Sequence, residues 1–409
     1  MNHLSKETWR LRGWLLAEIR RYFETHGFME VQTPSMNPWS TPEPFLYPFW
    51  VVPYGSAIPD QRRADDENAI NIGDNASAPT PIRDHSLQPV AGLQSPASLI
   101  TSPEFNLKIL WSELRSNIFE IAHCFRGQEY GTLHSQEFLM LEWYACDYDE
   151  FKTIHFIHSL ILGLLQHGAD CFPTLVPTGS GTSEAAEGDG SPKGTATAGN
   201  SAGDAGPGRT GHHAAPARKS GTSLELEIHS IKELFRKHLD CGLEKEELIR
   251  VCEEKGHFRH DTGAQKRARR YEEYFFTLFL NYIEAVLPPE KLVAVHGYPE
   301  PLSAYASLEN GRARRFEIYW RGLELANGYR ELTDAKEQRN RMMAEARLKK
   351  DLTGLPPALP EQFLAVMQTR GLPDGCGVAL GLERLLMALT GSQDIRQISP
   401  FPSTPGDPG

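Results

Sequence analysis

The segment FRGQEYGTLHSQEFLMLEWY, residues 125–144, constrains the fold of this chain more than any other stretch. Apolar and polar residues alternate in its second half and in residues 119–124 just before it, and the loop between these runs contains Gly127 and Gly131. Alternation with a period of two, interrupted by turn-forming residues, is typical of two strands that a loop connects. The sequence therefore predicts a strand, a polar loop and a second strand.

The second of these strands carries charged and aromatic side chains on one face. Side chains two residues apart point to the same side of a strand, and those that share this face are Phe138, Met140, Glu142 and Tyr144. Arg126 stands where the first strand enters the loop. A guanidinium pairs with phosphate and an aromatic ring stacks on a base, so this surface fits ATP. The alternative is an ordinary hairpin with a surface arginine and core aromatics.

The charge and the cysteines of the chain narrow its class. The net charge of the 409 residues is −11, which argues against broad, non-specific binding of nucleic acid because such binding needs a basic surface. The six cysteines include no CxxC pair, so neither a disulfide framework nor a zinc ribbon is indicated. No stretch approaches the roughly 18 apolar residues of a membrane span, and the N-terminus has no apolar signal core. We expect a cytoplasmic protein that does not bind a membrane.

The N-terminal residues predict a helix, a short strand and a stop. Ser5 precedes an apolar stripe that consists of Trp9, Leu11, Leu15, Ile19 and Phe23. The stripe has helical spacing, so we expect an amphipathic helix that extends to about His26 and ends at Gly27. Residues 28–33 then alternate as a strand, and Pro34 ends it because proline cannot donate to a sheet ladder.

Two stretches interrupt the ordered pattern. Residues 55–97 are rich in Asp, Asn, Ala and Pro, and we expect a surface insertion there. Residues 178–223 contain no Val, Leu, Ile, Met or aromatic residue. Such a composition cannot offset the entropy of ordering, so we expect a disordered Gly/Ala/Ser-rich insertion.

Helical and strand patterns fill the segments around these stretches. Ser102-Pro103 opens a predicted helix with Glu104 in its first turn, and this cap also offers polar groups to a ligand. Further helices are expected at residues 151–167, 244–254 and 267–287, and a buried strand at residues 291–298.

The segment RFEIYWRGLELANGYRELTD, residues 315–334, alternates on both sides of Asn327-Gly328, a strong short-range signal of a hairpin turn. A two-residue turn at this position would place Glu324 opposite Glu331 on one face of the sheet. Two facing carboxylates in a water-poor site need a cation, and Mg²⁺ takes oxygen ligands from carboxylates and phosphates. The alternative is a solvated edge hairpin in which water screens the repulsion.

The segment GCGVALGLERLLMALTG, residues 375–391, combines small residues with a helix start. A strand is expected to run into Gly381, and Arg384 then lies in the first turn of the next helix. Glycine lets a ligand approach the backbone, and an arginine at a helix start adds to a positive end that suits phosphate. The alternative is a buried packing turn. The chain has no Walker-type P-loop and no strand-borne GxGxxG, which excludes P-loop and Rossmann sites.

The motifs described above resemble, together and in this order, the signature motifs of the class II aminoacyl-tRNA synthetases. They are FRGQE with EFLMLEWY, then GLELANGYREL, then GLER. The resemblance covers residues 4–49, 99–166 and about 224–401, and ELANGYREL is similar to the lysine-type branch. Within that branch, TSPEFNLK, GVALG and HSQEFLMLEWY look most like the stand-alone paralogues that attach (R)-β-lysine to a lysine of elongation factor P. The first predicted helix begins almost at residue 1, so we expect one catalytic domain over residues 1–409 and no anticodon-binding domain.

The resemblance implies an α+β fold, with an antiparallel β-sheet flanked by helices, and a homodimer that forms through the Pro34 unit. It implies an AMP-forming ligase that activates lysine or (R)-β-lysine with ATP and Mg²⁺ and transfers it to elongation factor P, without tRNA. Arg126 and Arg384 would be catalytic, on the α- and γ-phosphate respectively, and Phe138 would stack on adenine.

The same resemblance implies a set of site residues at matching positions. Those implied in ATP binding are Arg126, Gly127, Gln128, Ser135, Phe138, Glu324, Leu325, Gly381 and Arg384. Those implied in amino-acid binding are Ser102, Pro103, Glu104, Tyr144, Glu331 and Ala379. Glu324 and Glu331 would together hold Mg²⁺. A carboxylate together with a phenol suits the two ammonium groups of a lysine.

The chain departs from the synthetase pattern at several positions. Gln128 replaces the usual glutamate, Thr132 a loop arginine and Ser135 an asparagine. Ala379 stands where lysyl-tRNA synthetases have glycine, and its methyl group predicts a preference for (R)-β-lysine. Two other functions stay open. A truncated lysyl-tRNA synthetase would charge tRNA, and an inactive paralogue that serves as a binding module would show no lysine-dependent pyrophosphate exchange.

Overall fold

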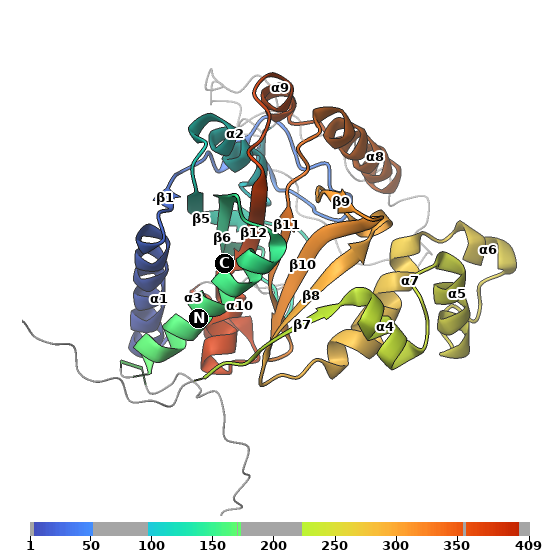
Figure 1. The fold of residues 1–409 in the computed structure, drawn as a ribbon, viewed down its shortest axis with the longest axis horizontal. Coiled ribbons are helices and arrows are strands. Elements are labelled where there is room, and N and C mark those ends of the chain that lie inside the picture. The colour runs from blue at the N-terminus through green and yellow to red at the C-terminus, as the bar shows by residue number, and fades with distance from the viewer. Residues whose placement is uncertain (1–3, 52–96, 170, 173–222, 355–356, 401–409) are drawn as a thin grey trace, which may run out of the picture.

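The computed structural model describes residues 4–51, 97–169, 171–172, 223–354 and 357–400, which form a large β-sheet flanked by helices (Figure 1). The order of the strands along the sheet is β1-β5-β6-β12-β11-β10-β8-β7, and β9 pairs with β10. Neighbouring strands are antiparallel except for two pairs at the edges, β1 with β5 and β7 with β8. The predicted α+β fold with an antiparallel sheet is confirmed.

The strands of the large sheet are β1 (Met29–Glu30), β5 (Ile118–Phe125), β6 (Glu137–Cys146), β7 (Leu226–Ser230), β8 (Leu292–Pro299), β9 (Leu308–Glu309), β10 (Arg312–Trp320), β11 (Leu323–Arg330) and β12 (Gly375–Gly381). A small sheet contains β2 (Met36–Asn37), β4 (Ala97–Leu99) and β3 (Trp50–Val51), in that order. The α-helices are α1 (Lys6–Thr25), α2 (Glu104–Leu114), α3 (Glu150–Gly168), α4 (Ile231–Leu239), α5 (Lys245–Glu254), α6 (Gly263–Ala268), α7 (Tyr271–Leu278), α8 (Ala335–Thr353), α9 (Glu361–Thr369) and α10 (Leu382–Thr390).

The two faces of the sheet differ in what covers them. Along β6, Leu139, Leu141 and Trp143 belong to the main hydrophobic core, which also contains residues of α1, α3 and α10 (Figure 1). The alternate side chains of β6 point to the opposite face, where Tyr144 packs against Trp111 of α2 at a ring distance of 5.4 Å. One face is therefore sealed by a helical core, and the polar groups of the strands are directed to the other.

The N-terminal helix agrees with its prediction, but the strand after it is shorter. The side chain of Ser5 accepts a hydrogen bond from the N–H of Thr8 (3.0 Å) and caps α1, and Gly27 follows the helix with a φ of +78°. Four of the five stripe residues are buried, whereas Trp9, the first of them, is 48% exposed. Of the strand predicted over residues 28–33, β1 keeps only two residues.

The prediction of a hairpin turn at Asn327-Gly328 is wrong. Both residues lie inside β11, where Asn327 pairs with Glu317, and the turn between β10 and β11 is at Arg321-Gly322. These two residues have φ of +55° and +73°, as tight hairpin turns require. Gly328 allows close packing rather than a turn, because a Cβ at this position would lie 2.6 Å from the ring of Phe316.

The observed position of the turn separates the two carboxylates that were expected to face each other. Glu324 and Glu331 follow each other along one strand direction, about 20 Å apart at the usual rise per residue. Pairing shifts within β11, because Ile318 faces Ala326 whereas Tyr319 faces Glu324, which leaves Leu325 as an extra residue. Such a bulge re-aims the side chains beyond it. It brings Glu324 to the same face of the sheet as Asn327.

The single helix predicted over residues 267–287 is interrupted. α6 ends before Arg269, which is extended at φ −59° and ψ 145°, and α7 then starts at Tyr271. The N–H of Arg270 donates to the carboxylate of Glu273 (3.2 Å), a cap that requires a non-helical residue at this point. α7 continues into a π-helical turn (Phe279–Ile283) and a 3-10 turn (Glu284–Val286).

The two predicted insertions lie almost entirely outside the described residues. Within the described part of the chain, Ala97, the last residue predicted for the first insertion, is buried in β4. The other elements predicted around them are present, as α3, α5 and β8.

Candidate active site

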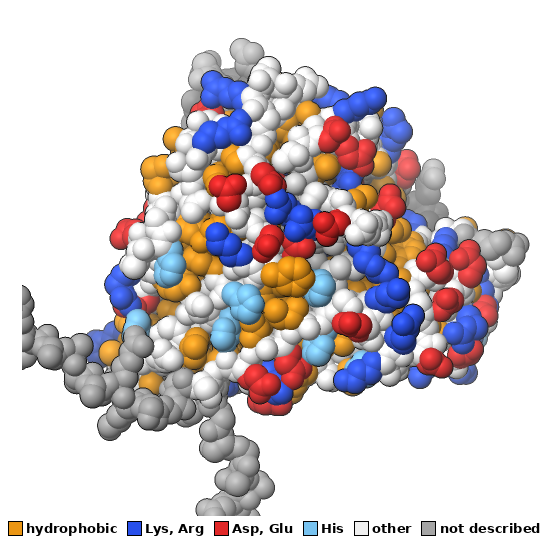
Figure 2. Space-filling view, viewed as in Figure 1, with side chains coloured by type: hydrophobic (Ala, Val, Ile, Leu, Met, Phe, Trp, Pro, Cys, Tyr) orange, Lys and Arg blue, Asp and Glu red, His pale blue; other side chains and the backbone are white. Residues whose placement is uncertain are grey.

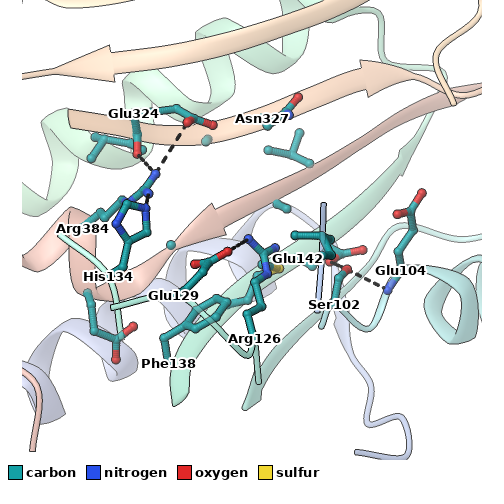
Figure 3. A pocket seen from close by; sticks show the side chains of 18 of the residues that line it. Ser102, Glu104, Arg126, Glu129, His134, Phe138, Glu142, Glu324, Asn327 and Arg384 are labelled. Atoms are coloured by element: carbon teal, nitrogen blue, oxygen red, sulfur yellow. Dashed lines mark hydrogen bonds and ion pairs between the residues drawn. The ribbon is translucent and has the colours of Figure 1, made fainter. Parts of the chain in front are cut away.

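A cavity of about 210 Å³ lies over the face of the sheet that Phe138, Met140, Glu142 and Tyr144 share (Figure 3). The predicted residues that line it are Ser102, Glu104, Arg126, Ser135, Phe138, Tyr144, Glu324, Leu325, Glu331, Ala379, Gly381 and Arg384. Segments that are far apart in the sequence thus meet in one site. Their roles in binding stay predictions.

The floor of the cavity consists of cross-strand rows of β6, β12 and β11. In one row Glu142 pairs with Ala379, which pairs with Asn327, and in the next row Tyr144, Gly377 and Tyr329 are aligned. Gly377 leaves room for its neighbours, because a Cβ there would lie 2.4 Å from both Glu331 Oε1 and the ring of Tyr144. The small residues of GVALG therefore make space for the larger side chains of the strands on either side.

One end of the cavity carries the two predicted arginines. Arg126 Nε donates to the carbonyl oxygen of Thr101 (3.1 Å), and its guanidinium lies 5.2 Å from the ring centre of Phe138. Arg384 Nη1 donates to the carbonyl oxygen of Glu324 (3.0 Å). Both guanidiniums are thus held by backbone carbonyls on two sides of one space.

His134 belongs to this arginine end and was missed by the sequence analysis. Burial lowers the pKa of His134, and the charge of Arg384 lowers it further. A neutral imidazole can accept a hydrogen bond, and Arg384 Nη2 lies 2.7 Å from His134 Nε2 (Figure 3). His134 is the neighbour of the predicted Ser135 in the loop between β5 and β6. This position in the motif could have indicated that His134 is a site residue.

The other end of the cavity is lined by carboxylates around a buried lysine. Lys108 of α2 is fully buried, and its ammonium lies 2.6 Å from Glu104 Oε1 and 2.7 Å from Glu331 Oε2. The hydroxyl of Tyr329 donates to Glu104 (2.7 Å). Lys108 and Tyr329 were not predicted as site residues, although Lys108 follows Glu104 by four residues, the spacing of neighbours on a helix face.

Glu142 completes this acidic end from the centre of β6. It accepts hydrogen bonds of 2.7 Å from the hydroxyls of both Ser102 and Tyr144. Burial raises the pKa of Glu142 to about 8, and the charge of Glu104 adds to the rise. The alternation of residues 137–144 predicts the correct face for Glu142, but no role in binding was predicted for it.

The carboxylates of this end exceed its cations. Burial raises the pKa of Glu331 to about 7, although Lys108 opposes the shift. Burial disfavours the charge of Lys108, yet Glu104 and Glu331 hold its pKa above the ordinary value. One buried ammonium thus serves three carboxylates, and a ligand with two further ammonium groups would compensate the remainder.

The predicted Mg²⁺ site shared by Glu324 and Glu331 is not formed, because Glu331 lies at the acidic end beside Lys108. Burial, followed by the charge of Glu317, raises the pKa of Glu324 to about 7. No group of three or more Asp, Glu, His or Cys suited to a metal occurs among the described residues. One or two carboxylates with the phosphates of a substrate are nevertheless a usual Mg²⁺ site. Glu324 lines the cavity and fits this ion, whereas Glu317 does not line the cavity and already bonds to Arg315, Tyr298 and Tyr319.

Three predicted residues do not line the cavity. Pro103 flanks the start of α2, and Gly127 and Gln128 line a neighbouring cavity instead. The N–H of Gly127 donates to the carbonyl oxygen of Tyr47 (2.6 Å), and Gln128 has a φ of +64°. The loop backbone therefore turns these two residues away from the strand face.

The family model for tRNA synthetases class II (D, K and N) matches residues 79–405, which is well over half of the chain. The chain belongs to this family, and it is a ligase.

Two relatives are similar to this chain over nearly its whole length. Elongation factor P–(R)-β-lysine ligase of Erwinia tasmaniensis is 28% identical over 399 residues, which cover 95% of this chain and 93% of the relative. The protein of the same name from Haemophilus ducreyi is 27% identical over 400 residues, which cover 97% and 94% respectively. Within the described part of the chain, no helix is long and apolar enough to cross a membrane.

Proposed function

We propose that this protein adenylates (R)-β-lysine or lysine with ATP and transfers it to a lysine side chain of elongation factor P. The observation that carries the proposal is the division of one cavity into an arginine end and an acidic end (Figure 3). A polyphosphate matches the first and a diamino acid the second. The names of the relatives support the choice of amino acid and acceptor.

The first step joins the two ends of the cavity. ATP would stack its adenine on Phe138, with Arg126 at the α-phosphate and Arg384 at the γ-phosphate. A carboxylate oxygen of the amino acid attacks the α-phosphorus, the bond to the β-phosphate oxygen breaks, and pyrophosphate leaves. Fixed guanidiniums stabilise the charge that develops on phosphorus. Mg²⁺ held by Glu324 and the phosphates would neutralise phosphate charge when bound.

The second step transfers the activated amino acid. The amine of the acceptor lysine attacks the carbonyl carbon of the adenylate, the C–O bond to phosphate breaks, and AMP leaves while the amine loses a proton. The acidic end holds the diamino acid during both steps. Glu142 and Glu331 would keep it in place through its ammonium groups.

The proposal also includes a protein acceptor, a homodimer and a cytoplasmic location. On the face seen in Figure 2, basic and acidic side chains are interspersed. The net charge of −11 supports a protein acceptor over tRNA. A homodimer would cover the exposed Met29 of β1 and Met36 of β2, which lie on either side of Pro34 in the sequence. All six cysteines are free thiols, as a cytoplasmic location would require.

Incubation with ATP, each lysine isomer and elongation factor P, followed by intact-mass analysis, tests the proposal. We expect the mass of elongation factor P to rise by one lysyl group with (R)-β-lysine. Charging of tRNA in its place would identify a truncated lysyl-tRNA synthetase. Absence of any lysine-dependent pyrophosphate exchange would identify a binding module.

A further inference from the structure

The segment from Thr41 to Leu46 forms part of the cavity wall and is held from outside the sheet. Glu43 and Leu46 both line the cavity. The ammonium of Lys349 in α8 donates to the carbonyl oxygens of Thr41 (2.7 Å) and Leu46 (2.8 Å). Lys349 is only 5% exposed. One buried side chain therefore fixes both ends of the segment that carries Glu43.

Glu43 is also oriented within this segment. The hydroxyl of Thr41 donates to Glu43 Oε2 (2.9 Å), and the N–H of Glu43 donates to the hydroxyl oxygen of Thr41 (3.3 Å). The N–H of Leu46 lies 3.4 Å from the carbonyl oxygen of Glu43 and closes a turn. The carboxylate is thus set in place by local bonds before any ligand arrives.

The charges around Glu43 show which part of a ligand it would meet. Burial raises the pKa of Glu43 and the charge of Glu104 raises it further, whereas Arg126 lowers it. Glu43 shares the large cavity with Arg126, and it lines a second, smaller cavity together with Ser102 and Glu104. Glu43 therefore stands near both the acidic end and the arginine proposed for the α-phosphate. The carboxyl of the amino acid reacts at that phosphate, so the amine beside this carboxyl comes within reach of Glu43 and Glu104.

We propose that Glu43 is a further specificity residue of the amino-acid site. With Glu104 it binds the ammonium group next to the reacting carboxyl, and Lys349 is the positioning residue that holds it there. Glu142 and Glu331 then bind the distant ammonium. The assignment rests on the proposed function, and it adds a fourth carboxylate that selects where the near amine is attached.

Glu43→Gln, compared on two compounds, tests this assignment. (R)-β-lysine has both amines, whereas 6-aminohexanoate has the carboxyl and the distant amine but lacks the near one. In pyrophosphate exchange we expect kcat/KM for (R)-β-lysine to fall by about 10- to 100-fold, the range for loss of a charged hydrogen bond. The inhibition constant of 6-aminohexanoate and the KM for ATP should stay nearly constant.

Variants of Lys349 separate positioning from general stability. Lys349→Met should reproduce the selective loss for (R)-β-lysine, and Lys349→Arg should restore much of it because a cation is regained. Lys350→Met, at the exposed neighbouring position of α8, is the matched control and should behave as wild type. Should Lys349→Met fail to fold, Glu43→Gln decides alone.

The outcomes distinguish this inference from the proposed function. Equal losses for both compounds, or no loss for either, in a folded Glu43→Gln variant would overturn the role of Glu43 while leaving the function intact. If the wild type exchanges pyrophosphate with no lysine isomer, the proposed function fails. Binding titrations with the same two compounds then decide whether Glu43 contacts the near amine.

Discussion

The two ends of the cavity hold their charges in different ways. The side chains of Arg126 and Arg384 are 23% and 28% exposed and bond to backbone carbonyls. The carboxylates at the other end are more deeply buried, with Glu331 at 1%, and burial raises the pKa of both Glu142 and Glu331. A guanidinium remains charged under all these conditions, whereas the charge of the acidic end depends on its ligand. Arg126 and Arg384 also lie 3.5 and 3.6 Å from the carboxylates of Glu129 and Glu324. Under the proposed function, phosphate would bind at the arginine end, and the ammonium groups of the amino acid would complete the acidic end.

The largest effect is expected at the arginine end. Arg384→Ala should lower pyrophosphate exchange by about a thousandfold or more, because it removes a fixed charge from the transferring phosphates. Arg396→Ala is a suitable control, since Arg396 is 49% exposed and pairs with Asp394. Near-normal exchange by a folded Arg384→Ala variant would contradict the ATP site.

A smaller, selective loss is expected at the acidic end. Glu142→Gln keeps the shape of the residue but removes its charge, so kcat/KM for (R)-β-lysine should fall by about 10- to 100-fold. The KM for ATP should change little. Glu120→Gln provides the control, because Glu120 is buried directly opposite Glu142 but bonds to the N–H of Thr33.

Steady-state exchange with both variants decides between the two ends. Equal losses for ATP and for the amino acid would show that Glu142 supports the whole cavity rather than the ammonium. A loss in Glu120→Gln as large as that in Glu142→Gln would show the same.

The arginine end was predictable because its parts lie within short motifs. Arg126 and Phe138 belong to one hairpin, and alternation alone places Phe138 on the correct face. Arg384 follows a small-residue strand directly. Local periodicity contains this information, so no long-range contact had to be known.

The acidic end was less predictable because distant segments build it. Glu43, Glu104, Glu142 and Glu331 come from a loop, α2, β6 and the position just after β11. The bulge at Leu325 and the position of the turn follow from how β11 packs between its neighbours, which no dipeptide signal records. The Asn-Gly signal therefore gave the wrong hairpin and the wrong partner for Glu324.

A still smaller effect is expected where the two ends meet. Ala379 lines the cavity and pairs with both Glu142 and Asn327. Its methyl group should crowd an α-amino acid more than a β-amino acid, whose amine is displaced by one carbon. Ala379→Gly should shift the ratio of kcat/KM toward α-lysine by about tenfold, as one methyl contact typically does. An unchanged ratio in steady-state adenylation would show that Ala379 is a packing residue.

The smallest effect concerns stability against pH in the ligand-free protein. The pKa of Glu142 is raised from 4.5 to about 8 by burial and by Glu104. A carboxyl with a raised pKa in the folded state stabilises that state fully below pH 4.5, and this contribution is lost as pH rises through about 8. The melting temperature of the wild type should therefore decrease from pH 5 to pH 8. In Glu142→Gln this decrease should be smaller, by about 1–3 °C for a chain of this size. Saturating (R)-β-lysine should reduce the decrease in the wild type, because its ammonium groups favour the charged carboxylate. Calorimetry at several pH values measures both quantities, and parallel curves for the two proteins would show that the acidic end is already compensated without a ligand.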